Sequence, residues 1–183
     1  MHKDSAAIYD ELLVLKAQSR DSAAFAELVQ RWHARLLAHA VRLTRDADGA
    51  DEAMQEVWLA IVRGIGKLKD PGAFGFWAYR IVGRECANWV HRRQRVRREG
   101  SQDGLQDAPT PQHAAPPVAT DGLAEAMDAL SVEHREVLAL YYMQDMSIDQ
   151  IAAMLEIRQG TVKSRLHYAR EAMRTAITKK SNE

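Results

Sequence analysis

The chain has 183 residues, 46% of them apolar, and its 25 Lys and Arg residues balance 25 Asp and Glu residues. This length suits one domain or two small ones, and the composition is ordinary for a globular protein. No run approaches the ~18 apolar residues that span a bilayer, and the start of the chain leads into an acidic amphipathic segment and not a signal peptide. We therefore expect no membrane insertion and a cytoplasmic location.

The sequence offers little for catalysis or metal binding. Cys86 is the one cysteine, and it lies within an apolar helical pattern, which favours a core position over a nucleophile. The seven histidines are scattered without ligand spacing. There is also no nucleophile–base pair and no phosphate-binding loop. We expect no metal, no cofactor and no catalytic residue, and we set aside the hypothesis of a helical enzyme.

The N-terminal part has helical periodicity throughout and no alternation typical of a strand. Apolar residues predict a helix near 8–15, a second that is capped by Asp21 or Ser22 and continues to Leu43, a third near 53–62, and a long fourth from about Ala73 into an arginine-rich block. The polar residues 44–49 predict a break, and residues 64–72 predict a loop.

Residues 99–122 contain four of the five prolines and almost no large apolar side chain. Such a composition cannot bury enough surface to fold. We therefore predict an acidic, flexible linker that divides the chain into domains at 1–98 and 123–183 and lets them sit far apart. In the second domain we predict a helix from Leu123, another capped by Ser131, and then two short helices around a tight turn.

These last two helices, within residues 147–170, have the pattern of a helix-turn-helix. Ser147 and Gln150 form a capping box. In the second helix an apolar stripe of Val162, Leu166, Ala169 and Met173 lies opposite small polar residues, with cations on its flanks. A helix of this kind can enter the DNA major groove. A solvated amphipathic helix in a bundle explains the pattern equally well.

The zero net charge hides a segregation of charges. Residues 80–98 carry seven arginines against Glu85 alone, and residues 158–180 carry seven cations against Glu171 alone. Acidic residues dominate between these blocks. Two basic blocks indicate two separate phosphate contacts, although a charged run is more often only a solvated face.

Aromatic residues Phe74, Phe76, Trp77 and Tyr79 precede Arg80 and Arg84 at the start of the long helix. Aromatic rings beside cations can hold unstacked single-stranded bases. A core position is the favoured interpretation for Trp77 and Trp89, whereas Phe74, at the loop edge, is the better candidate for exposure.

On the preceding helix an acidic patch could bind a basic protein surface or be simply solvated; it comprises Asp51, Glu52, Gln55 and Glu56.

Together these segments resemble bacterial RNA polymerase sigma factors of the extracytoplasmic-function (ECF) group of the sigma-70 family. Residues 133–138, 151–152 and 160–170 are similar to region 4 of that family, residues 50–58 to region 2.2, and residues 76–81 to the segment that melts and reads the −10 element. The resemblance implies an all-α fold with a region 2 helical bundle and a region 4 helix-turn-helix, joined by the linker.

The resemblance also implies a function, which is promoter-specific transcription initiation with core RNA polymerase. The acidic patch would bind the β′ clamp helices, and the linker would enter the RNA exit channel near the β subunit. The −10 element would be contacted by Lys69, Phe74, Trp77, Tyr79, Arg80, Arg84, Arg92 and Arg93. The −35 element would be contacted by Arg158, Thr161, Lys163, Ser164, Arg165, His167 and Tyr168. An anti-sigma factor is expected by family analogy.

Four positions depart from the usual family pattern: Gly49, Arg84, Glu156 and Arg158. Glu156 occupies a turn position usually given to Gly, so a positive φ there would cost ~1 kcal/mol.

The alternative function is a helix-turn-helix regulator that binds duplex operator DNA without polymerase. Tight sequence-specific binding by the protein alone would favour it.

Overall fold

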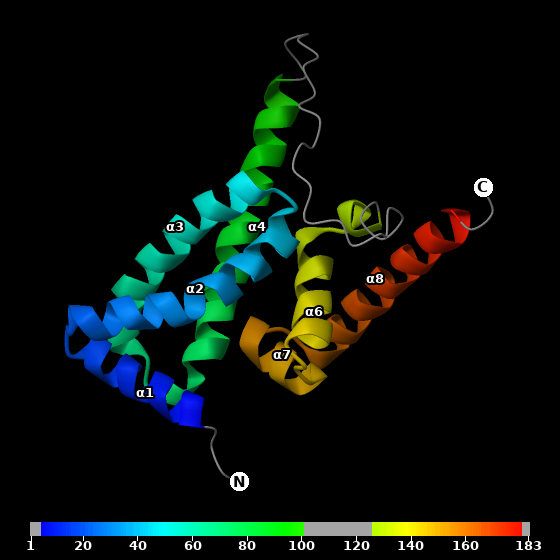
Figure 1. The fold of residues 1–183 in the computed structure, drawn as a ribbon. Coiled ribbons are helices and arrows are strands. Elements are labelled where there is room, and N and C mark those ends of the chain that lie inside the picture. Colours follow the sequence, from blue (N-terminus) through cyan, green and yellow to red (C-terminus); the bar gives the residue numbers. More distant parts are fainter. Residues whose placement is uncertain (1–4, 101–125, 181–183) are drawn as a thin grey trace.

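The computed structural model describes residues 5–100 and 126–180, and all its regular elements are helical, as expected. The N-terminal unit contains α1 (Ser5–Gln18), α2 (Ser22–Thr44), α3 (Ala47–Gly64), η1 (Ile65–Lys67), η2 (Pro71–Ala73) and α4 (Phe74–Gly100). The C-terminal unit contains a helical turn at 126–129, then α6 (Val132–Met143), α7 (Ile148–Leu155) and α8 (Gln159–Lys180) (Figure 1). Helix α4 continues to Gly100, and the rest of the predicted linker, with residues 123–125, lies outside the described residues.

Side-chain caps fix where the helices begin. Asp21, not Ser22, caps α2 by accepting from the backbone N–H groups of Ala23 and Ala24. The break predicted at 44–49 is too long, because Asp46 caps α3 by accepting from the N–H of Gly49. Gly49 is buried inside α3, and the Trp89 indole occupies the space that a Cβ at that position would need.

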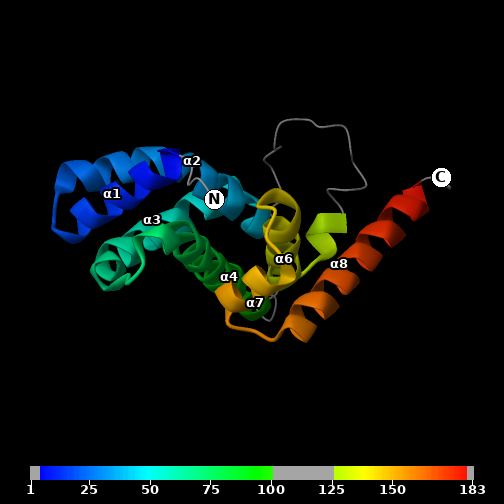
Figure 2. The same ribbon diagram turned by 90° about the horizontal axis from the view of Figure 1, so that it is seen from below.

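The helices of the N-terminal unit form a bundle around one core. Helices α1 and α2 form a hairpin, and α2, α3 and α4 pack on one another (Figures 1 and 2). Fully buried residues from three helices form its centre, including Leu28, Leu36, Val57, Ile61 and Val82. The core thereby holds the outer faces of α3 and α4 in a fixed relation.

The C-terminal unit does not stand apart from this bundle. Helix α6 packs on α2 and α4, and α7 packs on α4 (Figure 2). Buried residues of both units, such as Cys86 on α4 and Leu140 on α6, belong to one continuous apolar cluster. The prediction is that the linker lets the units sit far apart, whereas in the structure they touch. Buried apolar residues of α4 pack in the same cluster as those of the C-terminal unit.

Candidate nucleic-acid interface

The helix-turn-helix forms as the pattern predicts. Ser147 and Gln150 complete both hydrogen bonds of the capping box at the start of α7. Glu156 ends α7 in the left-handed region with φ 54°, so the strain expected at this turn position is present. The stripe residues Val162, Leu166 and Ala169 of α8 are buried. The helix therefore has a fixed inner face and a fixed outer face.

The outer face of α8 presents most of the residues predicted to read the −35 element. Four side chains are exposed here: Lys163, Ser164, His167 and Tyr168. The Ser164 hydroxyl donates to the Thr161 carbonyl at 3.0 Å, and the Tyr168 ring stacks on His134. These contacts restrict the rotamers of the two side chains. A polar surface with restricted rotamers suits contacts with base edges.

The predicted cations of this helix are not equivalent. Arg158, in the turn, is exposed, whereas Arg165 is half-buried beside Glu133 and Glu136. The positive charge of Arg165 is therefore partly balanced within the protein. Thr161 is also half-buried. Arg158 and Lys163 are exposed, so their charges remain open to a partner from solvent.

The predicted exposure of Phe74 is wrong. Phe74 is 2% exposed and packs edge-on against Trp32 with ring centroids 5.3 Å apart. Tyr79 is also buried, against Trp32 and His39, and burial raises the pKa of its hydroxyl. Trp32 of α2 closes over both rings, so neither can stack on a base without opening the core.

Phe76 has the exposure that was expected of Phe74, and it is not among the residues predicted to contact the −10 element. It is 40% exposed, and Arg80 and Arg84 follow it at successive intervals of four residues, both exposed. Intervals of four place side chains along one face of a helix. Trp77 is half-buried against Gly64, and Trp89 is buried, as its core interpretation required.

The arginines of α4 are paired with carboxylates, some from distant segments. Arg80 contacts Glu156 of the helix-turn-helix at 2.6 Å, and Arg84 contacts the adjacent Glu85 at 2.8 Å. Arg92 pairs with Glu52 at 2.8 Å; Arg93 pairs with Asp46 at 3.1 Å and lies over the Trp89 ring. Lys69, at the loop, is exposed. DNA phosphates would have to compete with these carboxylates.

The acidic patch forms an exposed surface on α3, since Asp51, Glu52, Gln55 and Glu56 are all exposed. Glu52 is engaged, because it accepts from Trp89 Nε1 and from Arg92. Two apolar residues extend the patch along the same face, Leu59 at 45% and Val62 at 55% exposure. We missed them as contacts, although their spacing from Gln55 was a signal. An acidic surface with an apolar end suits a basic, amphipathic protein partner.

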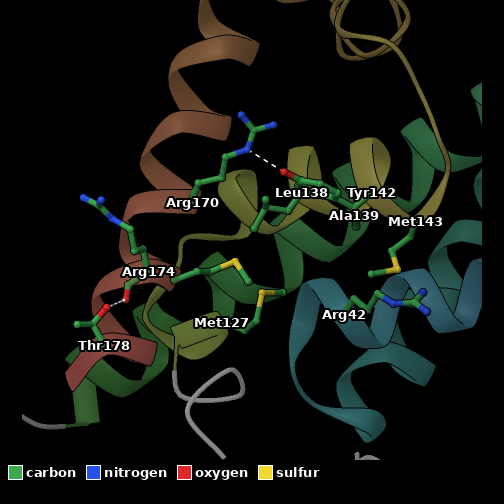
Figure 3. Close-up of a pocket in the computed structure, with 10 residues that line it drawn as sticks. Arg42, Met127, Leu138, Ala139, Tyr142, Met143, Arg170, Arg174 and Thr178 are labelled. Carbon is green, nitrogen blue, oxygen red and sulfur yellow. Dashed lines mark hydrogen bonds between the residues drawn. The ribbon is translucent and has the colours of Figure 1, made fainter. Parts of the chain in front are cut away.

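A groove lies where α6 and α8 meet α2, with a volume of about 830 Å³ (Figure 3). Its lining is largely apolar, including Met127, Leu138 and Met143, with Arg42, Arg170 and Arg174 also lining it. Arg170 donates to the Tyr142 hydroxyl and lies over the rings of Tyr141 and Tyr142. Such a groove suits an apolar segment that carries acidic residues.

The remaining expectations concern the reactivity of Cys86, metal binding and membrane insertion. Cys86 is buried, and burial raises the pKa of its thiol to about 12, so the thiol stays neutral. Among residues 5–100 and 126–180, no cluster of His, Cys, Asp or Glu could hold a metal ion. Within those same ranges, no helix combines the length and the apolar character needed to cross a bilayer.

Comparison with known proteins gives these surfaces a context. The sigma-70 region 2 family matches residues 28–96, and the sigma-70 region 4 family matches residues 120–173. The chain is 33% identical over 167 residues to the ECF RNA polymerase sigma factor SigL of Mycobacterium tuberculosis, covering 88% of this chain and 93% of that protein. It is 29% identical over 162 residues to SigE of Mycolicibacterium smegmatis, covering 86% of this chain and 63% of the length of SigE.

A solved structure has the same fold. It is the sigma factor RpoE of Bartonella quintana, determined with the anti-sigma factor NepR. The TM-score is 0.67 at 22% sequence identity, over 84% of this chain and 96% of that one. With the helical fold, the helix-turn-helix and both sigma-70 regions in order along the sequence, the chain belongs to the ECF group of RNA polymerase sigma factors.

Proposed function

We propose that this chain binds core RNA polymerase through α3, contacts the −10 element through α4 and reads the −35 element through α8. One observation carries the proposal: three exposed faces of different chemistry lie on three helices, in the order of the family's regions. They are the acidic–apolar face of α3, the Phe76–Arg80–Arg84 face of α4 and the polar face of α8. The protein would act as a polymerase subunit in the cytoplasm and not as an enzyme.

Polymerase binding tests the face on α3. Glu56→Arg reverses a charge at an exposed position, so it should weaken binding to fluorescently labelled core polymerase while the melting temperature stays unchanged. Asp149→Arg is the matched control, because Asp149 is an exposed carboxylate on α7, outside the patch. Equal affinities for the two variants would contradict the assignment of this face.

For the −10 element we propose Phe76 as the stacking residue in place of Phe74 and Tyr79, supported by its exposure beside Arg80. Stacking of one base contributes about 1–3 kcal/mol. Holoenzyme with Phe76→Ala should therefore open promoter DNA less, measured by the fluorescence of 2-aminopurine in the −10 element. Unchanged opening would exclude Phe76.

We also propose that an anti-sigma factor regulates this chain, as the partner of the structural neighbour suggests. The arginine-lined groove of Figure 3 is the candidate face, because its charge complements an acidic amphipathic helix. Binding of a purified anti-sigma domain should protect Met143, which is 58% exposed, from oxidation by peroxide. Oxidation of Met143 at the same rate in the complex would argue against this face.

The operator-binding regulator is not favoured, because the relatives above are polymerase sigma factors along most of this chain. It makes a different prediction, which is nanomolar sequence-specific binding to duplex DNA by the protein alone. A gel shift with and without core polymerase separates the two functions.

A further inference from the structure

The loop between α3 and α4 positions two candidate DNA contacts. This loop, residues 65–73, contains η1 and η2 and carries the exposed Lys69, one of the residues predicted to contact the −10 element. It also leads directly into the first turn of α4, where Phe76 lies. The place of the loop on the bundle therefore sets the positions of Lys69 and Phe76.

Local hydrogen bonds give the loop its turns. The N–H of Leu68 donates to the carbonyl of Ile65 at 3.1 Å, and Asp70 caps η2 by accepting from the N–H of Gly72 at 2.9 Å. Each of these bonds joins residues two or three positions apart, so it closes a turn without tying that turn to another element. Contacts with other helices have to fix the loop on the bundle.

Gln18, the last residue of α1, makes such a contact. Its Nε2 donates to the carbonyl of Ile65 at 3.0 Å and to the carbonyl of Leu68 at 2.7 Å. A side-chain amide nitrogen carries two hydrogens, so both bonds form together. Because both partners are acceptors, the nitrogen and not the oxygen of the amide has to face the loop. One side chain thereby ties the start of η1, and the residue that follows η1, to α1.

Packing accompanies these two bonds. Helix α1 packs on η1 and η2 as well as on α2 (Figure 1). A Cβ at Gly72 would lie 2.9 Å from Oε1 of Glu11, so α1 also reaches the middle of η2. Gln18 is half-buried, and hydrogen bonds partly removed from water are stronger than fully exposed ones.

Helix α1 is itself fixed on the bundle. Val14 is fully buried, and Asp10 accepts from Nε of Arg31 on α2 at 2.6 Å. Gln18 therefore projects from a rigid support, which accurate positioning requires. The match to sigma-70 region 2 begins at residue 28, so this support lies before the matched region.

We propose that Gln18 is a positioning residue for the −10 contact, because it holds the loop in the place from which Lys69 and Phe76 meet DNA. In this role Gln18 acts through two loop carbonyls and does not touch DNA. The proposal rests on the proposed function for its effect on promoters, whereas the hold on the loop is a property of the protein alone. A role confined to stability would lower the melting temperature and leave recognition of the −10 sequence unchanged.

Hydrogen exchange on the full chain tests the hold on the loop without polymerase. Gln18→Met keeps a side chain of similar length and removes both donors. The backbone amides of residues 65–73 should exchange about tenfold faster in this variant, the effect of two lost hydrogen bonds, while amides in the centre of α2 should exchange as in the parent protein. Gln30→Met is the matched control, because Gln30 is exposed on α2, and it should leave the loop unchanged.

DNA binding by the holoenzyme tests the consequence. The probes are a single strand carrying the −10 sequence shared by mapped promoters and a scrambled strand of the same composition. Gln18→Met should lower the preference for the −10 strand by about tenfold, with unchanged affinity for core polymerase. Gln18→Lys should restore the preference, because its ammonium group donates to the same carbonyls from a longer side chain. The scrambled strand corrects for the added charge.

The proposal is overturned if the loop of Gln18→Met exchanges like that of Gln30→Met, or if it exchanges faster while the preference for the −10 strand is kept. It is also overturned if Gln18→Lys has the full defect of Gln18→Met, since the donors would then not be the cause. Failure of the proposed function gives a different result: the parent holoenzyme would bind both strands equally, while faster exchange in Gln18→Met would still support the hold of Gln18 on the loop.

Discussion

His39 lies in the centre of the N-terminal core with 0% exposure, and neither of its ring nitrogens has a hydrogen-bond partner. Its ring lies nearly perpendicular to that of Tyr79, with centroids 5.1 Å apart. Burial, helped by the charge of Arg42, lowers the pKa of the imidazole from 6.5 to about 3. His39 therefore stays neutral in the folded protein at any pH near neutrality.

The sign of the resulting pH dependence follows from the lowered pKa. The unfolded chain takes up a proton at His39 below pH 6.5, and the folded chain does not until about pH 3. The contribution of His39 to the free energy of unfolding is complete above pH 6.5, and it is lost as the pH falls below that value. Between pH 7.5 and pH 5 the loss is about 2 kcal/mol, or a melting temperature lower by roughly 4–8 °C.

The variant His39→Leu removes this contribution, because it replaces the imidazole with an apolar side chain of similar volume. Acidification from pH 7.5 to 5 should cost the variant about 2 kcal/mol less than it costs the parent protein, measured by guanidinium unfolding at both pH values. His167→Leu, at an exposed position, is the control and should follow the parent. Equal acid losses in His39→Leu and the parent would refute the reasoning.

Three further predictions concern packing, base preference and backbone strain. Phe74→Ala should destabilise the protein by about 3–5 kcal/mol in chemical unfolding, since it empties a core position. Phe76→Ala should change the free energy of unfolding by less than about 0.5 kcal/mol. Similar losses in the two variants would contradict the assigned burial of Phe74 and exposure of Phe76. Ser164→Ala should change −35 base preference in a promoter-library selection, with mismatches worth about 1–3 kcal/mol, while Lys163→Ala should weaken all promoters alike; an unaltered consensus for Ser164→Ala would exclude direct reading. Arg20 has φ 66°, so Arg20→Gly should raise stability by about 1 kcal/mol in thermal melts, and a lower melting temperature would show that no strain is stored there.

Features that depend on neighbouring residues could be predicted from the sequence. The capping box of Ser147 and Gln150, the cap at Ser131 and the buried stripe through Val162 each follow from spacings of three or four residues. The positive φ of Glu156 follows from its place in a tight turn. Periodicity and capping are local, so they survive in any tertiary arrangement.

Features that depend on distant contacts could not be predicted. Phe74 follows a loop, and one of the rings that buries it belongs to Trp32, 42 positions earlier. Leu59 and Val62 fit an apolar pattern, but the bundle leaves their face uncovered. The carboxyl group of Glu136 on α6 occupies the space beside Gly83 on α4, so these two residues meet although the linker separates them in sequence. Helical spacing gives a face but does not say which other helix covers it.

The central claim is that this chain directs polymerase to promoters, and sequencing of transcript starts tests it most directly. Core polymerase with the protein is given a genomic template pool, and the 5′ ends of the transcripts are mapped. We predict starts at discrete positions, preceded by shared −10 and −35 sequences and absent with core polymerase alone. Starts no more focused than those of core polymerase alone, from a mixture in which the protein is bound to core, would contradict the account.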